Sequence, residues 1–114
     1  MPYVVKVSEA ALKDLTLVFE HLRQSYMEFG EDEATARLRA AERIRDIQRH
    51  VERIAALPHQ GTLRPEFGPN VRSLTHQKAI YWFEVDEDAE ELRVLAIFFG
   101  GQDHIRHMLR RLLK

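Results

Sequence analysis

The sequence lacks cysteine altogether, so neither a disulfide nor a thiolate-ligated metal site can form. It also lacks any apolar run close to the roughly 18 residues that a membrane-spanning helix requires. No basic leader followed by a long apolar stretch stands at its start, and we therefore expect a cytoplasmic protein with no membrane partner. An excess of one charge is missing as well, because 17 lysines and arginines face 18 aspartates and glutamates. This balance argues against broad nucleic-acid binding and leaves only a local basic patch for such a contact.

Glycine and proline are scarce and concentrated in one place. Three of the four prolines and two of the five glycines fall within residues 58–70, which predicts an ordered but irregular loop. The polar residues of this loop are interpreted as part of its rigid packing: His59, Gln60, Arg64 and Glu66. The 114 residues, of which 45% are hydrophobic and 31% charged, suit one globular domain over 1–114.

Two amphipathic helices are predicted in the first half of the chain. Ser8 follows a β-branched run at 3–7, which predicts a strand, and is suited to cap a helix that ends at Gly30. Pro58 stops the second helix, whose other face carries mixed charges. Because the two helices are joined by about three residues, they should form an antiparallel hairpin. Their apolar stripes are Leu12, Leu15, Phe19, Leu22, Tyr26 and Phe29, and then Leu38, Ala41, Ile44, Ile47, Val51 and Ile54.

Three strand-like runs follow at 71–75, 79–86 and 92–99. Alternation places Tyr81, Phe83 and Val85 on one face of the second run, opposite Ile80 and Trp82. In the third run it places Leu95, Ile97 and Phe99 opposite Val94, Ala96 and Phe98. Since both faces are apolar, the pair is either covered on both sides or open on one side to a partner.

A last helix is predicted after the Gly100-Gly101 break, with Asp103 as its cap. Its apolar residues are Ile105, Met108, Leu109, Leu112 and Leu113. The order β-α-α-β-β-β-α describes an α+β domain in which a helical hairpin packs on a small, mainly antiparallel sheet.

This order, together with particular segments, resembles the RelE/ParE toxin superfamily, and the ParE branch more than the RelE branch. The matching segments run almost end to end: residues 10–15, Leu57-Pro58 with Gly61, Val71-Arg72-Ser73-Leu74, residues 81–86 and residues 94–103, where a strand ends in a glycine-centred turn. The resemblance implies the toxin of a type II toxin–antitoxin system, associated with growth inhibition and plasmid stabilisation. Its partner would be a cognate antitoxin, and no cofactor is implied.

The resemblance leaves the target open between two kinds of toxin. ParE-like toxins inhibit DNA gyrase by binding, whereas RelE-like toxins cleave mRNA on the ribosome. An inactive homologue that acts as a co-repressor with its antitoxin is a third reading. The oligomeric state, a homodimer or a toxin–antitoxin hetero-oligomer, also stays open.

Candidate residues follow from these readings. Cleavage of RNA needs a proton acceptor, a proton donor and cations around the phosphate. The candidates for that chemistry are Arg72, Lys78 and Tyr81, with His76 and the histidines and arginines of the last helix as further members. RelE-type sites resemble a basic set with a carboxyl-terminal tyrosine, and no tyrosine follows Tyr81 here. We therefore favour a binding inhibitor over an enzyme.

For a binding inhibitor, the expected contacts with the target are basic: Arg72, Arg106, Arg110 and Arg111, with Lys114 beyond. Ile80, Trp82 and Phe98 form the face expected to receive the antitoxin. His104 and His107 are close enough on one helix to share a metal, but no third ligand is evident and no metal site is predicted.

Overall fold

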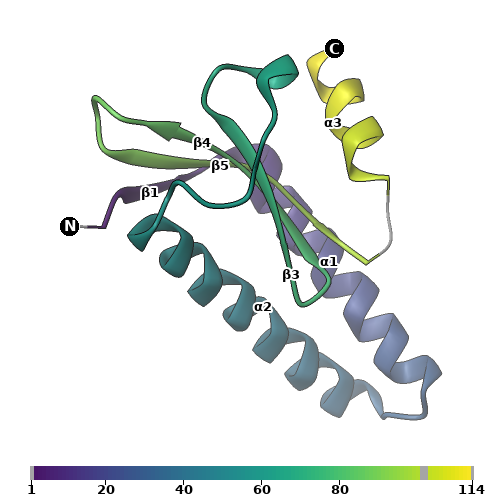
Figure 1. Cartoon of the computed structure of the whole chain (residues 1–114). Helices are drawn as coiled ribbons and strands as arrows, with labels where there is room; N and C mark the ends of the chain where they lie inside the picture. The colour runs from purple at the N-terminus through teal and green to yellow at the C-terminus, as the bar shows by residue number, and fades with distance from the viewer. Residues whose placement is uncertain (1, 101–102, 114) are drawn as a thin grey trace.

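We describe the chain from a computed structural model that defines residues 2–100 and 103–113 (Figure 1). Its elements are β1 (Val4–Val7), α1 (Glu9–Glu28), α2 (Glu33–Ala56), β2 (Thr62–Leu63), a short 3-10 helix (Pro65–Phe67), β3 (Val71–His76), β4 (Ala79–Asp86), β5 (Glu91–Phe99) and α3 (His104–Leu112). The predicted α+β order is confirmed, and two short elements inside the proline-rich loop are added to it: β2 and the 3-10 helix. Gly101, Gln102 and Lys114, assigned from sequence to a turn and a basic end, lie outside the described residues. Within those residues, no helix is both long and apolar enough to cross a membrane.

The five strands form one mixed sheet in the order β1-β5-β4-β3-β2. β1 pairs in parallel with β5, and the remaining neighbours pair antiparallel. The helical hairpin α1–α2 lies against one face of the sheet, and α3 lies over the other face (Figure 1). The central strands are thus covered on both sides, the first of the two arrangements that their apolar faces predicted.

The helices begin and end where local chemistry dictates. The side chain of Ser8 accepts a hydrogen bond from the amide of Ala11 at 3.0 Å, which confirms it as the cap of α1. Asp32 caps α2 through the amide of Thr35, at 2.7 Å. Gly30, at a φ of +102°, reverses the chain between the helices, a conformation that favours glycine.

The larger core lies between the hairpin and the sheet, and the predicted helix stripes need correction there. Leu15, Leu22, Ile47, Val51 and Ile54 are buried as expected. Three residues of the predicted stripes are exposed instead: Leu12, Leu38 and Phe29, the last at 88%. The buried faces are completed instead by small side chains that let the helices approach each other and the sheet: Ala11, Ala36, Ala40 and Ala55.

A β-bulge changes the predicted faces of β5. The pairing with β4 shifts between Trp82 and Phe83, so that Trp82 opposes Ala96 and Phe83 opposes Val94. Leu95 is the extra residue, and the alternation reverses there. Val94 therefore packs with Ile97 on the face covered by the α1–α2 hairpin, while Leu95 packs on the face covered by α3. The alternation predicted for β4 is confirmed.

Candidate functional site

The face of the sheet beneath α3 holds the three residues predicted to bind an antitoxin. Ile80, Trp82 and Phe98 form a second apolar cluster with Val71, Ala96 and Met108. Trp82 is completely buried, and Phe67 of the 3-10 helix packs edge-on against its ring at 4.9 Å. In this structure α3 occupies the place of the expected partner on these residues.

Polar groups surround the indole of Trp82 and tie this face together. Its Nε1–H donates to Nδ1 of His104 at 3.0 Å, which makes Nδ1 the acceptor nitrogen of that imidazole. On the other side, the guanidinium of Arg64 lies 5.5 Å from the indole centre and donates from Nε to Ser73 Oγ at 2.9 Å. Burial, followed by the charge of Arg64, lowers the pKa of His104 below its usual value. His104 is therefore held as a neutral acceptor.

Arg64 is a residue whose place the sequence analysis missed. It was assigned to the passive packing of a proline-rich loop, yet β2 turns that loop back alongside β3 and brings Arg64 over the sheet. Gly61 permits the approach, since a Cβ at this position would lie 2.5 Å from the carbonyl oxygen of Ser73. The signal in the sequence was Gly61 itself, three residues before a lone arginine in a loop otherwise poor in cations.

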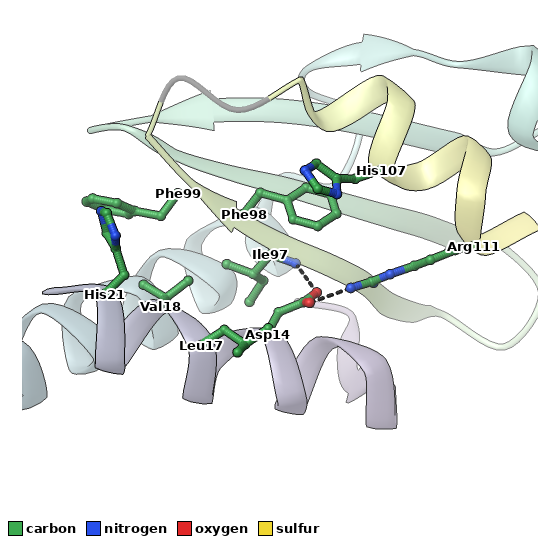
Figure 2. Close-up of a pocket in the computed structure, with 9 residues that line it drawn as sticks. All are labelled: Asp14, Leu17, Val18, His21, Ile97, Phe98, Phe99, His107 and Arg111. Carbon is green, nitrogen blue, oxygen red and sulfur yellow. Dashed lines mark hydrogen bonds and ion pairs between the residues drawn. The ribbon is translucent and has the colours of Figure 1, made fainter.

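A buried carboxylate joins α1, β5 and α3. Asp14 is 4% exposed and accepts a hydrogen bond from the amide of Ile97 at 3.0 Å and another from the guanidinium of Arg111 (Figure 2). Arg111 also donates to the carbonyl of Leu95 at 3.2 Å and stacks over Phe98 at 5.2 Å. We call this arrangement the Asp14–Arg111 latch.

The latch provides hydrogen-bond partners for backbone groups at one edge of β5. β1 pairs with β5 only as far as Val94, so the amide of Ile97 and the carbonyl of Leu95 lie on the edge beyond it. Asp14 and Arg111 take up these two groups, since unpaired backbone groups at an edge are costly to bury and invite pairing with another chain. Beside the latch is a cavity of about 200 Å³ between α1, β5 and α3, lined by the nine residues drawn in Figure 2. Asp14 went unnoticed in the sequence although it stands inside an apolar face, three residues after Ala11 and four before Val18.

The three residues proposed for RNA cleavage differ in their surroundings. Tyr81 is buried on the face of the sheet that the α1–α2 hairpin covers, and this burial raises the pKa of its phenol to about 12. Arg72 pairs with Phe83 of β4, so its side chain also lies on the face of the sheet that the α1–α2 hairpin covers. It lies toward the edge formed by β2. Lys78 lies in the tight β3–β4 turn with a positive φ of 69° and an exposed side chain.

One carboxylate, that of Glu87, interacts electrostatically with Arg72. Glu87, in the β4–β5 turn, hydrogen-bonds to His59 and, at 2.7 Å, to the hydroxyl of Tyr3. These two bonds, in that order, and then the charges of His59 and Arg72, lower the pKa of Glu87. Arg72 therefore lies close enough to Glu87 for a favourable electrostatic interaction, on the face opposite to α3.

The arginines of α3 divide into two groups. Arg111 faces inward in the latch, with a side chain that is 31% exposed. Arg106 and Arg110 are exposed, and Arg106 pairs with Asp103 at 3.4 Å. Asp103 caps the helix through the amide of Arg106 at 3.3 Å, as predicted. His107 packs against Phe98 and His104 against Trp82, and the described residues contain no group of three potential ligands that could hold a metal.

The architecture of this chain, but not its sequence, matches known proteins. No family model matches the sequence, and no curated protein matches it. Solved structures do match. A chain of the chromosomal ParDE toxin–antitoxin system from P. aeruginosa superposes with a TM-score of 0.62 at 24% identity, covering 86% of this chain and 96% of that one. A mutant of the E. coli toxin RelE in the free state gives 0.61 at 11% identity, with 94% and 93% covered.

The chain has the RelE/ParE toxin fold. The RelBE2 toxin–antitoxin complex from Mycobacterium tuberculosis extends the likeness, with a TM-score of 0.51 at 13% identity over 87% of this chain and 99% of that one. ParE-type and RelE-type structures fit this chain almost equally well, so the RelE/ParE fold by itself does not separate a gyrase inhibitor from a ribonuclease. That distinction depends on the side chains.

Proposed function

We propose that this chain is the toxin of a type II toxin–antitoxin system and acts by binding, as a ParE-like inhibitor of DNA gyrase neutralised by a cognate antitoxin. The RelE/ParE fold over nearly the whole chain supports the toxin assignment. One observation carries the preference for binding over cleavage: the phenol that would transfer a proton is buried. Tyr81 is buried with a raised pKa, Arg72 lies on the helical face, and Lys78 is in a turn.

General acid–base catalysis requires donor and acceptor within hydrogen-bonding reach of one reacting group. A phenol with a pKa of about 12 is a poor proton acceptor at neutral pH. Inhibition by binding asks for less, namely an exposed surface complementary to the target in shape and charge.

The exposed arginines of α3 are the better-placed contacts for the target. Arg106 and Arg110 project from a short basic helix, whereas Arg111 acts through the latch and positions that helix. Arg72 lies across the sheet from α3, so it would touch the target through a separate surface. The proposal keeps all four arginines and gives Arg111 a positioning role.

The antitoxin is proposed to contact Ile80, Trp82 and Phe98. Because α3 covers these residues, an antitoxin segment must take the place of α3 on the sheet. An apolar stripe on that segment would replace Met108, and binding would free the basic helix or remove it from its active position. Neutralisation then follows from the same movement that permits binding.

A RelE-like ribonuclease is the second candidate, favoured by one specific arrangement. Arg64 and His104 flank Trp82 on the face beneath α3, so that a cation and a titratable base meet there over the sheet. If this chain cleaves RNA, that pair is a more suitable centre than Arg72 with Tyr81. A co-repressor without toxicity remains a third outcome of the experiment.

The experiment is to induce this protein alone in a bacterial host and follow the incorporation of labelled thymidine and labelled methionine over the first minutes. The proposal expects DNA synthesis to fall first, and purified gyrase to lose supercoiling activity on addition of the protein. Early collapse of translation, with transcripts cut at the ribosome, would support the ribonuclease instead. Unaltered growth with tight antitoxin binding would identify the co-repressor.

A further inference from the structure

A basic cavity lies between α2 and the β3–β4 hairpin, away from α3. Two of its residues, His76 and Tyr81, were among the candidates for RNA cleavage. Its volume is about 290 Å³. Five of its lining residues come from α2, and three come from the hairpin: Arg43, Asp46, Arg49, His50 and Arg53, and then His76, Gln77 and Tyr81. We call this cavity the α2 basic niche. The sequence analysis treated Arg43 and Arg49 only as part of a solvated, mixed-charge face and did not single out Arg53.

The side chains of the niche carry a net positive charge. Positions 43, 46, 50 and 53 recur at spacings of three and four and so share one face of α2. Three arginines face one carboxylate, which gives a charge of +2 while the histidines are neutral. Asp46 is already paired with Arg49 at 2.7 Å, and no ion pair of Arg53 occurs within the described residues.

One rim of the niche is held in place by Arg43. Its guanidinium donates to the carbonyl oxygen of Gln77 and packs over Phe99 at 5.5 Å. Gln77 and Lys78 both have positive φ, the backbone of a tight hairpin turn. The turn and α2 therefore face each other in a fixed geometry, with the cavity between them.

Two imidazoles stack at the base of the niche. The rings of His50 and His76 are parallel within 2°, with centres 3.9 Å apart, and the ring of Tyr81 lies 5.1 Å from His50. Both ring nitrogens of His50 are buried and have no hydrogen-bond partner in the described part of the chain. A buried polar atom without a partner is costly, so this imidazole is suited to a polar group entering from the niche.

We propose that the α2 basic niche binds a dianionic phosphate group, with Arg49, Arg53 and His50 as its ligands. A charge of −2 matches the +2 of the surrounding side chains. Guanidinium groups present paired N–H donors to phosphate oxygens, and an imidazole adds one more. The volume is several times that of a water molecule and leaves room for the group that carries the phosphate. A terminal phosphate fits this charge better than a phosphodiester, which bears a single negative charge.

Binding is expected to strengthen as the pH falls. Burial first, and then the nearby His76 and Arg53, lower the pKa of His50 in the empty niche. An anion offsets the two cationic neighbours and favours the charged imidazole, so protons are taken up on binding. The groups that face His50 are Arg43, Asp46, Arg49 and Arg53 from α2, and His76 and Tyr81 from the hairpin.

The test is an NMR titration of the full chain, in which the imidazole resonances of His50 and His76 are followed. Inorganic phosphate is added at pH 7.5, with chloride used to keep the ionic strength constant. Saturable shifts of both imidazoles are expected. Sulfate, which is dianionic across the range, serves for the pH dependence and should bind more tightly at pH 6 than at pH 7.5. A short oligonucleotide with a 5′-phosphate, compared with the same oligonucleotide bearing a 5′-hydroxyl, shows whether the group belongs to a polynucleotide end.

Three substitutions in α2 make the result specific. Arg53→Gln should weaken phosphate binding about tenfold, since it removes one charge-assisted hydrogen bond. Asp46→Asn should tighten binding, because it removes the only carboxylate of the niche. Arg37→Gln, an equal charge change on the same helix outside the niche, should leave the affinity within about twofold. The proposal is overturned if the two imidazoles do not respond to phosphate, if Arg37→Gln weakens binding as much as Arg53→Gln, or if the oligonucleotide binds equally well without its terminal phosphate.

Discussion

Replacing Arg111 by methionine should release α3 from the sheet. Methionine keeps the length of the side chain and much of its apolar contact with Phe98, but it removes both hydrogen bonds of the guanidinium. Asp14 would then remain buried with the amide of Ile97 as its one partner within the described residues. A buried carboxylate that has lost its cation is strongly destabilising unless water can reach it.

The magnitude follows from the exposure of the two partners. Breaking a fully buried ion pair costs about 3–5 kcal/mol, and breaking an exposed pair costs at most about 1 kcal/mol. Asp14 is 4% exposed and Arg111 is 31% exposed, so the latch lies between these limits. We expect a loss of about 2 kcal/mol in the docking of α3, which corresponds to a roughly thirtyfold larger undocked fraction.

Trp82 reports this change directly. It is the only tryptophan of the chain, it is completely buried, and its indole donates to His104 of α3. In the Arg111→Met protein we expect a red-shifted emission, greater quenching by acrylamide and faster hydrogen exchange of the α3 amides. Arg110→Met is the matched control, because it makes the same chemical change on the exposed side of the same helix.

Asp14→Asn completes a double-mutant cycle. The amide keeps an oxygen for the amide of Ile97 but no longer attracts the guanidinium, so adding Arg111→Met should then cost little more. We expect a coupling of about 1–2 kcal/mol between the two positions. Equal quenching in the Arg111→Met and Arg110→Met proteins, or additive effects in the cycle, would show that the latch does not hold α3.

Three further outcomes can be measured. Gly61→Ala should destabilise the fold by about 2–3 kcal/mol in urea denaturation, since the backbone has a φ of +84° and the new methyl would lie 2.5 Å from a β3 carbonyl oxygen. Gly30→Ala, also at positive φ but with nothing within 4 Å, should cost only about 1 kcal/mol; equal costs would remove the steric argument. His104 has a pKa below the usual 6.5, so the docked state disfavours its protonation and α3 docking is fully present above pH 6.5. As the pH falls below 6.5 the undocked state binds more protons, and Trp82 emission should shift to the red, a shift that His104→Gln should abolish. Arg72→Ala should lose toxicity yet still bind antitoxin, as judged by growth after induction and by co-purification, and full toxicity would remove Arg72 from the target surface.

The fold was predictable because the signals for it are local. Caps, helical spacing and strand alternation act within a few residues, and Ser8, Gly30 and Asp103 all fulfil the roles that these rules assign. The reversal at Leu95 was not predictable in the same way. A bulge depends on the register with the neighbouring strand, which a sequence pattern read along one strand does not contain.

The site was harder to predict because it depends on which face of the sheet each residue occupies. Arg72 and Ser73 are adjacent in the sequence, yet Ser73 contacts Arg64 beneath α3 and Arg72 lies on the helical side. Asp14 and Arg111 are 97 positions apart and meet only after β5 has been placed between them. Nothing in a single sequence indicates that two charged residues so far apart will form a pair. The apolar residues of β4, in contrast, reveal which face they occupy through their alternation along the strand.

The latch also explains how a partner can reach the apolar face beneath α3. A nine-residue helix is too short to be stable alone in water, so α3 depends on its contacts with the sheet, and most directly on Met108, His104 and Arg111. A segment that supplies its own apolar side chains to Trp82 and Phe98 therefore competes against a small number of contacts. The latch sets the free energy of that competition, since Asp14 stays buried against β5 and loses its cation when α3 leaves. Arg111→Met should accordingly tighten the binding of any partner that displaces α3, by up to the roughly thirtyfold gained in the undocked fraction. A partner whose affinity is unchanged by Arg111→Met must bind elsewhere on the molecule, and Ile80, Trp82 and Phe98 would then be core residues only.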